Sequence, residues 1–134
     1  MTTSADPVVY VSTYRIRPGK FEDYSRFYAE LVRVVEANEP GVTGFLAFAT
    51  DDLGEITYVH VYRDGGTLDK HMAVLAEQMQ LLPSDLTAVM AYLEPVRIEV
   101  FGRPDGAAAE MDAGLRAAGV PFAAKPRYLG GFAR

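Results

Sequence analysis

Two histidines are the side chains of this sequence best suited to acid–base chemistry. His60 and His71 fall within residues 57–71, where a strand pattern ends, a turn follows at residues 64–66, and Thr67 is expected to cap a new helix. Because imidazole titrates near neutral pH, either ring could orient or deprotonate a phenolic or quinol substrate. We therefore predict both as catalytic residues. The alternative for each is a structural histidine that is hydrogen-bonded to its neighbours.

Hydroxyl-bearing side chains share a strand face with His60. Alternation along residues 8–17 and 55–63 places every second residue on the same side of its strand. A tyrosine-lined cavity offers ring contacts and hydroxyl groups together, which suits a small aromatic molecule. The same tyrosines are equally compatible with core and interface positions. The predicted substrate-binding residues are Tyr10, Ser12, Tyr14, Tyr58 and Tyr62.

The composition excludes several other chemistries. The sequence has no cysteine, which rules out disulfides, thiolate catalysis and cysteine-bound zinc or iron–sulfur clusters. The two histidines lie eleven residues apart and match no compact ligand motif, so we predict no metal site. Gly65-Gly66 could form an anion-binding turn, but no G-x-G-x-x-G pattern surrounds it and a flexible turn is the better interpretation.

Charge and hydropathy indicate a cytoplasmic single-domain protein. A length of 134 residues can bury a core of its own. The net charge is −5 without a basic run, so neither nucleic acid nor an anionic membrane is expected as a partner. No apolar stretch reaches the length of a membrane span, and residues 1–7 are too short and polar for a secretory signal.

The hydrophobic period changes along the chain in a recognisable order. Alternation predicts strands, and apolar residues three and four apart predict helices. The resulting β-α-β-β-α-β order predicts an α+β, ferredoxin-like fold with a four-stranded antiparallel sheet and helices on one face. The expected strands are 8–17, 42–50, 55–63 and 96–101, and the expected helices are 21–38, 67–82, a short piece at 84–93, and 105–118.

One face of such a sheet has no helices on it. The sequence leaves open which face this is, since the tyrosine-rich face is uncovered if the helices pack on the other side. In either case the uncovered face is apolar, and pairing with a second copy is the simplest way to bury it. If the helices cover the even-numbered side of the first and third strands, the uncovered face is expected to hold Val9, Val11, Thr13, Phe45, Ala47, Val59 and Val61.

Three short motifs carry a resemblance to a known family. They are Tyr-Arg-Ile-Arg-Pro-Gly-Lys at residues 14–20 followed by an amphipathic helix, a Gly-Val-x-Gly-Phe strand start at 41–45, and Val-Tyr-Arg-Asp at 61–64 followed by Leu68 and His71. Together they resemble the antibiotic biosynthesis monooxygenase-like domains of the dimeric α+β barrel superfamily. The resemblance covers residues 8–101. It divides the chain into a flexible start at 1–7, a domain at 8–103, and an extension at 104–134 that packs on its own domain or on a partner subunit.

The resemblance implies a homodimer paired through its sheet faces, with one pocket per subunit between sheet and helices. Family monooxygenases oxidise aromatic polyketides or quinols with molecular oxygen and without metal, flavin or haem, through a substrate carbanion or radical. The resemblance therefore implies no cofactor here, and it places His71 and Tyr62 at the mouth of the pocket.

The sequence also departs from the family. Polyketide-oxidising members use a tryptophan and an asparagine, whereas this chain has no tryptophan and its single asparagine, Asn38, ends the first helix. Leu81 stands where haem-degrading members have an iron-ligating histidine, so haem degradation is not expected. Two alternatives stay open: a non-catalytic dimeric barrel that binds a small apolar ligand, and an acid–base enzyme resembling polyketide cyclases or isomerases.

Overall fold

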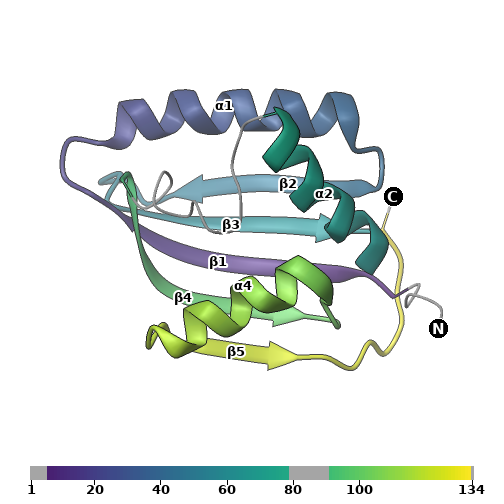
Figure 1. The fold of residues 1–134 in the computed structure, drawn as a ribbon. Helices are drawn as coiled ribbons and strands as arrows, with labels where there is room; N and C mark the ends of the chain where they lie inside the picture. Colours follow the sequence, from purple (N-terminus) through teal and green to yellow (C-terminus); the bar gives the residue numbers. More distant parts are fainter. Residues whose placement is uncertain (1–5, 79–90, 134) are drawn as a thin grey trace.

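The protein consists of a mixed sheet with helices packed on one side (Figure 1). The computed structural model describes residues 6–78 and 91–133. Its elements are β1 (Val8–Ile16), α1 (Phe21–Asn38), β2 (Val42–Ala49), β3 (Glu55–Tyr62), α2 (Gly65–Gln78), β4 (Leu93–Phe101), α4 (Gly106–Ala117) and β5 (Phe122–Lys125).

The sheet has the strand order β2-β3-β1-β4-β5. The first four strands pair antiparallel, which confirms the α+β, ferredoxin-like prediction for this part. The prediction of four strands was wrong, because β5 adds a parallel strand beside β4 and makes the sheet mixed. The helix α4 carries the chain back to the edge of β4, so the next strand runs in the same direction. With only four residues, two of them alanine, β5 has little strand signal in the sequence.

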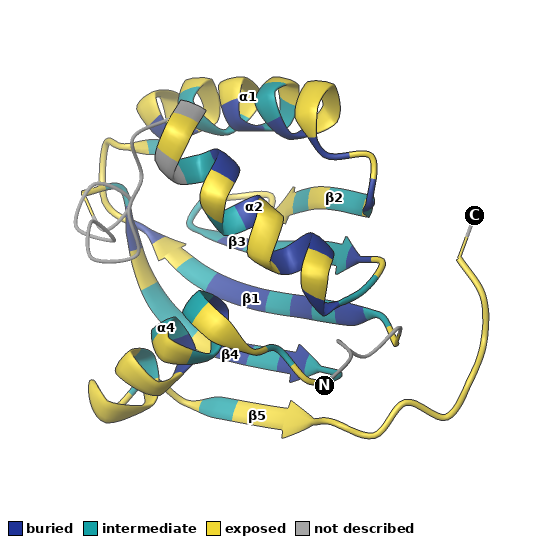
Figure 2. Cartoon of the chain, turned by 45° about the vertical axis from the view of Figure 1, so that its right-hand side comes forward, coloured by how far each residue is buried: buried dark blue, intermediate teal, exposed yellow. Residues whose placement is uncertain are grey.

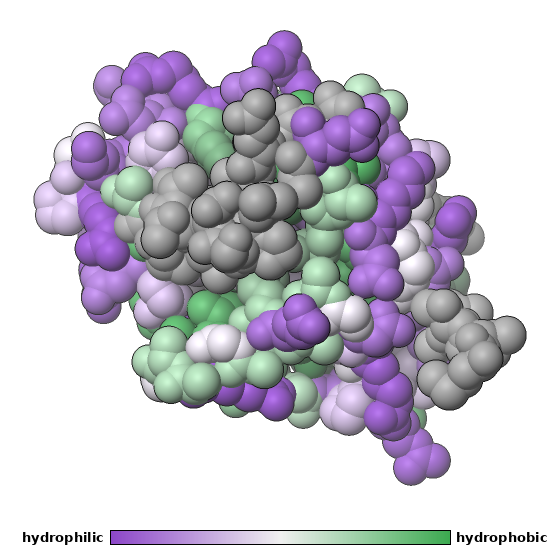
Figure 3. All heavy atoms as spheres, in the orientation of Figure 1, coloured by the Kyte–Doolittle hydropathy of each residue, from purple (hydrophilic) through white to green (hydrophobic). Residues whose placement is uncertain are grey.

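The helices lie on one face of the sheet (Figure 2), and burial places the even-numbered side chains of β1 and β3 on that face. Val8, Tyr10, Ile16, Ile56 and Tyr62 on this face are buried. The outer side of α1 is hydrophilic in Figure 3, as its charged residues predict. The structure therefore decides the question of faces that the alternation left open.

The uncovered face differs from the expected one in β2. Phe45 pairs with His60 and Ala47 with Tyr58, and directly opposed residues share a face, so both point toward the helices. Leu46 and Phe48 lie on the uncovered face instead, where their exposed fractions are 52% and 61%. Periodicity fixes faces only within one strand. The register between strands, which here shifts between Val42 and Gly44, is a property of the folded sheet.

The cap of α2 also differs from the prediction. Asp64, not Thr67, is the N-cap residue, because its Oδ1 accepts hydrogen bonds from Thr67 N at 2.7 Å and from Thr67 Oγ1 at 2.9 Å. The helix thus begins two residues earlier, at Gly65. This start places His71 at the end of the second helical turn.

The predicted helical piece at 84–93 and the end of the helical stripe beyond residue 78 lie outside the described residues. Leu93 nevertheless belongs to β4, which begins three residues before the predicted start at residue 96. Pro95 is tolerated in this strand because the pairing with β1 shifts between Thr13 and Tyr14, next to the Tyr14–Pro95 pair.

Two clusters of buried side chains form the core between sheet and helices. One joins Tyr10, Tyr62 and Leu68 to Ala108 of α4, and the other joins Tyr24 of α1 to strand residues such as Ile56. Among the described residues, no helix is both long and apolar enough to cross a membrane. The core therefore includes α4 as well as the two helices of the ferredoxin-like unit.

Candidate functional site

A buried glutamate–histidine pair joins the end of α1 to α2. His71 Nδ1 lies 3.1 Å from Glu39 Oε1 and 3.0 Å from Oε2, and the exposed fractions of the two side chains are 6% and 0%. Because a carboxylate can only accept, the Nδ1 hydrogen is donated to Glu39. The other ring nitrogen, Nε2, then carries the lone pair that can accept a proton.

A close approach of two backbone segments holds this pair together. Glu39 ends α1 with its N–H bonded to Val35 O at 2.9 Å, and the chain turns at residues 39–42. Gly41 then packs directly on Thr67, where a Cβ on Gly41 would lie only 2.5 Å from Thr67 Oγ1. The missing side chain at Gly41 thus lets the end of α1 reach the first turns of α2.

Aromatic rings surround the pair. The ring of Tyr62 is 5.2 Å from that of His71, and Phe45 is 5.7 Å away on the β2 side. Phe45 also stacks on His60 at 3.8 Å, so its ring lies near both histidines. His60 Nε2 is hydrogen-bonded to Tyr28 Oη of α1 at 3.2 Å. The histidines therefore lie on one aromatic wall, which we call the histidine cluster: Tyr28, Glu39, Phe45, Tyr58, His60, Tyr62 and His71.

Burial gives the two histidines different chemistry. Burial lowers the pKa of His60 to about 3, with a further contribution from nearby His71. His60 is therefore neutral near pH 7 and a weak base, which suits a hydrogen-bonding role better than proton abstraction. His71 keeps the carboxylate partner that stabilises a protonated imidazole, so it is the better candidate base.

The tyrosines of the wall stay protonated at neutral pH. Burial raises the pKa of Tyr14 to about 12 and raises the pKa of Tyr28, Tyr58 and Tyr62 as well. Tyr24 donates a hydrogen bond to Tyr58, and Tyr28 stacks on Tyr58 at 5.3 Å. These groups can donate or accept hydrogen bonds, but they do not supply phenolates.

The structure brings together most of the predicted site residues. Tyr58, His60, Tyr62 and His71 belong to the histidine cluster, and Tyr14 contacts Tyr58 edge-on at 5.5 Å. Ser12 is buried on the same face of β1. Tyr10 differs, because its hydroxyl donates to Asp112 Oδ2 of α4 at 2.9 Å while only its ring edge meets Tyr62.

Sequence reasoning missed three members of the cluster, Tyr28, Glu39 and Phe45. Tyr28 reads as one more residue of the apolar stripe of α1, and Phe45 was assigned to the other face. The position of Glu39 in the sequence did indicate that its side chain has a partner. An acidic residue at the C-terminal end of a helix is unfavourable next to the helix dipole, so it needs a partner elsewhere.

A small pocket adjoins the wall from the α1 side. It has a volume of about 180 Å³ and lies between α1 and β2, where Tyr24, Tyr28 and Ala47 line it. This volume is below the roughly 300–1,000 Å³ usual for ligand pockets, so it suits one ring of a ligand rather than a whole polycycle. Among the residues that the structure describes, no three histidine, aspartate or glutamate side chains gather as metal ligands.

Comparison with known proteins identifies the family. The sequence model of the antibiotic biosynthesis monooxygenase family matches residues 7–74, half of the chain. The chain therefore belongs to this family. A search of curated proteins found no match.

Solved structures with the same fold include MupZ from Pseudomonas fluorescens. Its sequence is 18% identical, and the superposition covers 96% of this chain and 95% of that chain with a TM-score of 0.64. They also include SnoaB, a cofactor-independent oxygenase from Streptomyces nogalater, with 18% identity, 76% and 97% coverage, and a TM-score of 0.56. At these identities the likeness shows the shared fold and nothing about activity.

Proposed function

We propose that the protein is a cofactor-independent monooxygenase-like enzyme for a small aromatic, quinol or polyketide-type substrate bound between sheet and helices. The observation that carries this proposal is the buried Glu39–His71 pair within an aromatic wall. The family membership and the oxygenase activity of SnoaB support the reaction class.

The pair would begin the reaction by removing a proton. His71 Nε2 takes a proton from an acidic C–H or O–H of the substrate, and Glu39 stabilises the imidazolium through Nδ1. The electron pair left on the substrate reduces molecular oxygen. For an anthrone, the CH₂ group becomes C=O, and the second oxygen atom leaves as water with the two hydrogens, so no external reductant is needed.

The remaining wall residues would hold the substrate. His60 is neutral, and together with the protonated Tyr58 and Tyr62 it offers hydrogen bonds beside flat rings. Ser12, Tyr14 and Tyr10 line the same sheet face toward β4. We therefore assign proton transfer to His71 and substrate binding to His60. The two histidines, both predicted from the sequence as catalytic, thus have different roles in this proposal.

Oxygen uptake tests the proposal. Purified protein is incubated with a panel of anthrones and hydroquinones, and oxygen consumption is compared for the wild type, His71→Gln and His60→Gln. Removing a general base lowers kcat by about 10²–10⁴-fold, so His71→Gln should lose most activity while the matched His60→Gln change chiefly raises KM. Wild-type kcat in His71→Gln would contradict the assignment.

A second function rests on the same pair. Proton transfer by Glu39–His71 needs no oxygen, so an isomerase or cyclase that uses only acid–base steps fits the geometry equally well. Turnover under nitrogen distinguishes the two reactions, because the oxygenase stops and the acid–base enzyme does not. Tight binding of a panel compound without turnover in either atmosphere would support the non-catalytic barrel.

We also propose that the protein is a homodimer paired through the uncovered sheet face. Leu46 and Phe48 support this proposal, since they give that face exposed apolar side chains beside the half-buried Val59. Leu129 and Phe132 of the extension are 91% and 83% exposed, and we assign them to contacts with the partner. Light scattering at micromolar concentration should give a dimer mass for the wild type and a monomer mass for Phe48→Lys. A monomeric wild type would overturn the proposal.

A further inference from the structure

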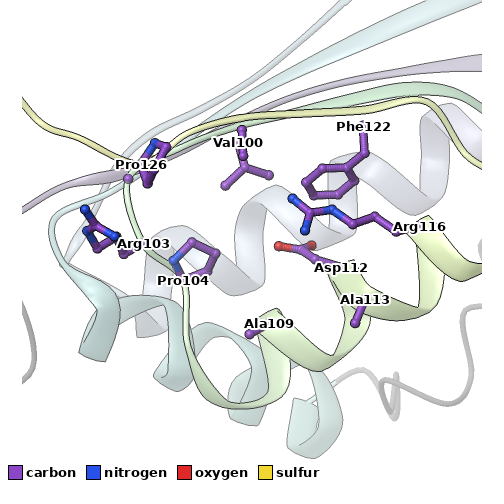
Figure 4. Close-up of a pocket in the computed structure, with 11 residues that line it drawn as sticks. Val100, Arg103, Pro104, Ala109, Asp112, Ala113, Arg116, Phe122 and Pro126 are labelled. Atoms are coloured by element: carbon purple, nitrogen blue, oxygen red, sulfur yellow. The ribbon is translucent and has the colours of Figure 1, made fainter.

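A larger pocket lies at the opposite end of the sheet from β2, between α4 and the strands β4 and β5 (Figure 4). Its volume is about 470 Å³, within the roughly 300–1,000 Å³ usual for small-molecule sites. Val100, Pro104, Ala109 and Phe122 give it apolar walls. The residues matched by the family model end at residue 74, so the pocket is formed by chain outside that match.

Asp112 lines this pocket with its carboxyl group, and one oxygen of that group is unsatisfied. Its side chain is only 6% exposed, and Tyr10 Oη donates to its Oδ2 at 2.9 Å. Oδ1 is also buried but has no hydrogen-bond partner. Leaving a buried carboxyl oxygen unpartnered is costly, so such an atom calls for a partner that the protein itself does not provide.

Arg116 would be the ordinary partner of Asp112, since the two residues are four apart on α4. They form no ion pair within 4.0 Å. The Arg116 guanidinium instead lies 4.1 Å from the centre of the Phe122 ring, and Figure 4 shows it between this ring and the Asp112 carboxyl group. Arg103 lies on the other side of the pocket in this view. Neither arginine is ion-paired with any described residue, so both can receive an anion.

We propose that this pocket is a second binding site, for a small hydroxylated carboxylic acid with an apolar body. The ligand carboxylate is received by Arg116, with Arg103 adding positive charge, and the ligand hydroxyl meets Asp112 Oδ1. Burial raises the pKa of Asp112. A hydroxyl suits this position because it can donate to the ionised carboxylate and accept from the protonated carboxyl group.

Calorimetry on the full-length protein tests the ligand chemistry. Mandelate carries the acid, the hydroxyl and a ring, phenylacetate lacks the hydroxyl, and methyl mandelate lacks the charge. Mandelate should bind about tenfold more tightly than either analogue, because each analogue leaves one buried or charged group without a partner. Mandelate should also shift the NMR methyl signals of Ala109 and Ala113, which line the pocket.

Variants localise the binding. Arg116→Gln should weaken mandelate binding about tenfold, whereas Arg33→Gln on the solvent face of α1 should not. Asp112→Asn should reduce the preference for mandelate over phenylacetate while keeping the bulk of the pocket. The proposal would be overturned if mandelate, phenylacetate and methyl mandelate bound with equal affinity. It would also be overturned if Arg116→Gln and Arg33→Gln bound mandelate equally well, or if mandelate shifted methyl signals outside the pocket instead. His71→Gln should bind mandelate as the wild type does, so this test does not depend on the proposed oxygenase activity.

Discussion

Glu39 at the end of α1 and Asp112 in α4 are both buried carboxyl groups, but their surroundings differ. Both oxygens of Glu39 lie within hydrogen-bond distance of His71 Nδ1, whereas Asp112 receives one bond from Tyr10 and keeps one oxygen open. A buried acid with a histidine partner is suited to proton transfer. A buried acid with a free oxygen beside a pocket is suited to ligand binding. The partner, more than the residue type, decides what a buried carboxyl group can do.

The largest difference should appear when the Glu39 side chain is removed. Glu39→Ala leaves His71 buried without its partner and should lower the free energy of unfolding by about 3 kcal/mol. Urea denaturation measures this loss. The matched control Glu36→Ala, on the exposed face of the same helix, should change stability by less than about 0.5 kcal/mol. Similar losses in both variants would mean that the pair contributes nothing beyond helix charge.

The approach of α1 to α2 can be tested without changing either charged group. Gly41→Ala places a Cβ 2.5 Å from Thr67 Oγ1, which is held by Asp64, and the overpacking should cost about 2 kcal/mol. Gly114→Ala is the control, because nothing lies within 4 Å of its added Cβ and alanine favours a helix by roughly 1 kcal/mol. A neutral Gly41→Ala would show that the contact is not what positions Glu39.

The histidine cluster should also make stability depend on pH. Folding lowers the pKa of His60 from 6.5 to about 3, so between these values the unfolded state binds the extra proton. Stability should therefore fall as the pH drops from 6.5 toward 3, by at most about 1.4 kcal/mol per pH unit from this residue. Urea unfolding at a series of pH values should show a shallower dependence for His60→Gln. An unchanged pH dependence would refute the buried neutral state of His60.

Asp112 should have the smallest effect on stability, and its pH dependence should be opposite in sign to that of His60. Burial raises its pKa above 3.8, so as the pH rises past this value the unfolded state loses its proton first and the fold is penalised. Asp112→Asn should remove this penalty, so the variant should gain stability at pH 7 relative to pH 4 when compared with the wild type. Glu110→Gln, an exposed change on the same helix, is the control. A loss of stability comparable to that of Glu39→Ala would erase the contrast between the two acids.

Much of the local structure could be predicted from the sequence. Period-two alternation located β1 and β3, and the spacing of apolar residues located α1 within its observed bounds. The short motifs around residues 14–20 and 61–64 pointed to the family that the chain belongs to. These features follow from neighbouring residues, whose spacing reports directly on helix and strand geometry.

Other features were predicted wrongly or not at all from the spacing of neighbouring residues. Thr67 looked like a cap, yet the preceding Asp64 fills that role, since two glycines can occupy the first turn. The assignment of Phe45 failed because the face of an edge strand depends on its register with β3. β5 was missed because its pairing depends on how α4 returns the chain to the sheet.

The sequence by itself determined the order of the elements from β1 to α2, the family, and the strand that carries His60. Only the tertiary structure decided which face the helices cover, that Glu39 meets His71, and that Asp112 keeps an open oxygen in a pocket lined by Arg103 and Arg116. The physical reason is that the residues in these contacts lie far apart in the sequence. Glu39 and His71 are 32 residues apart, and Tyr10 and Asp112 are 102 apart, so no local period records their contact.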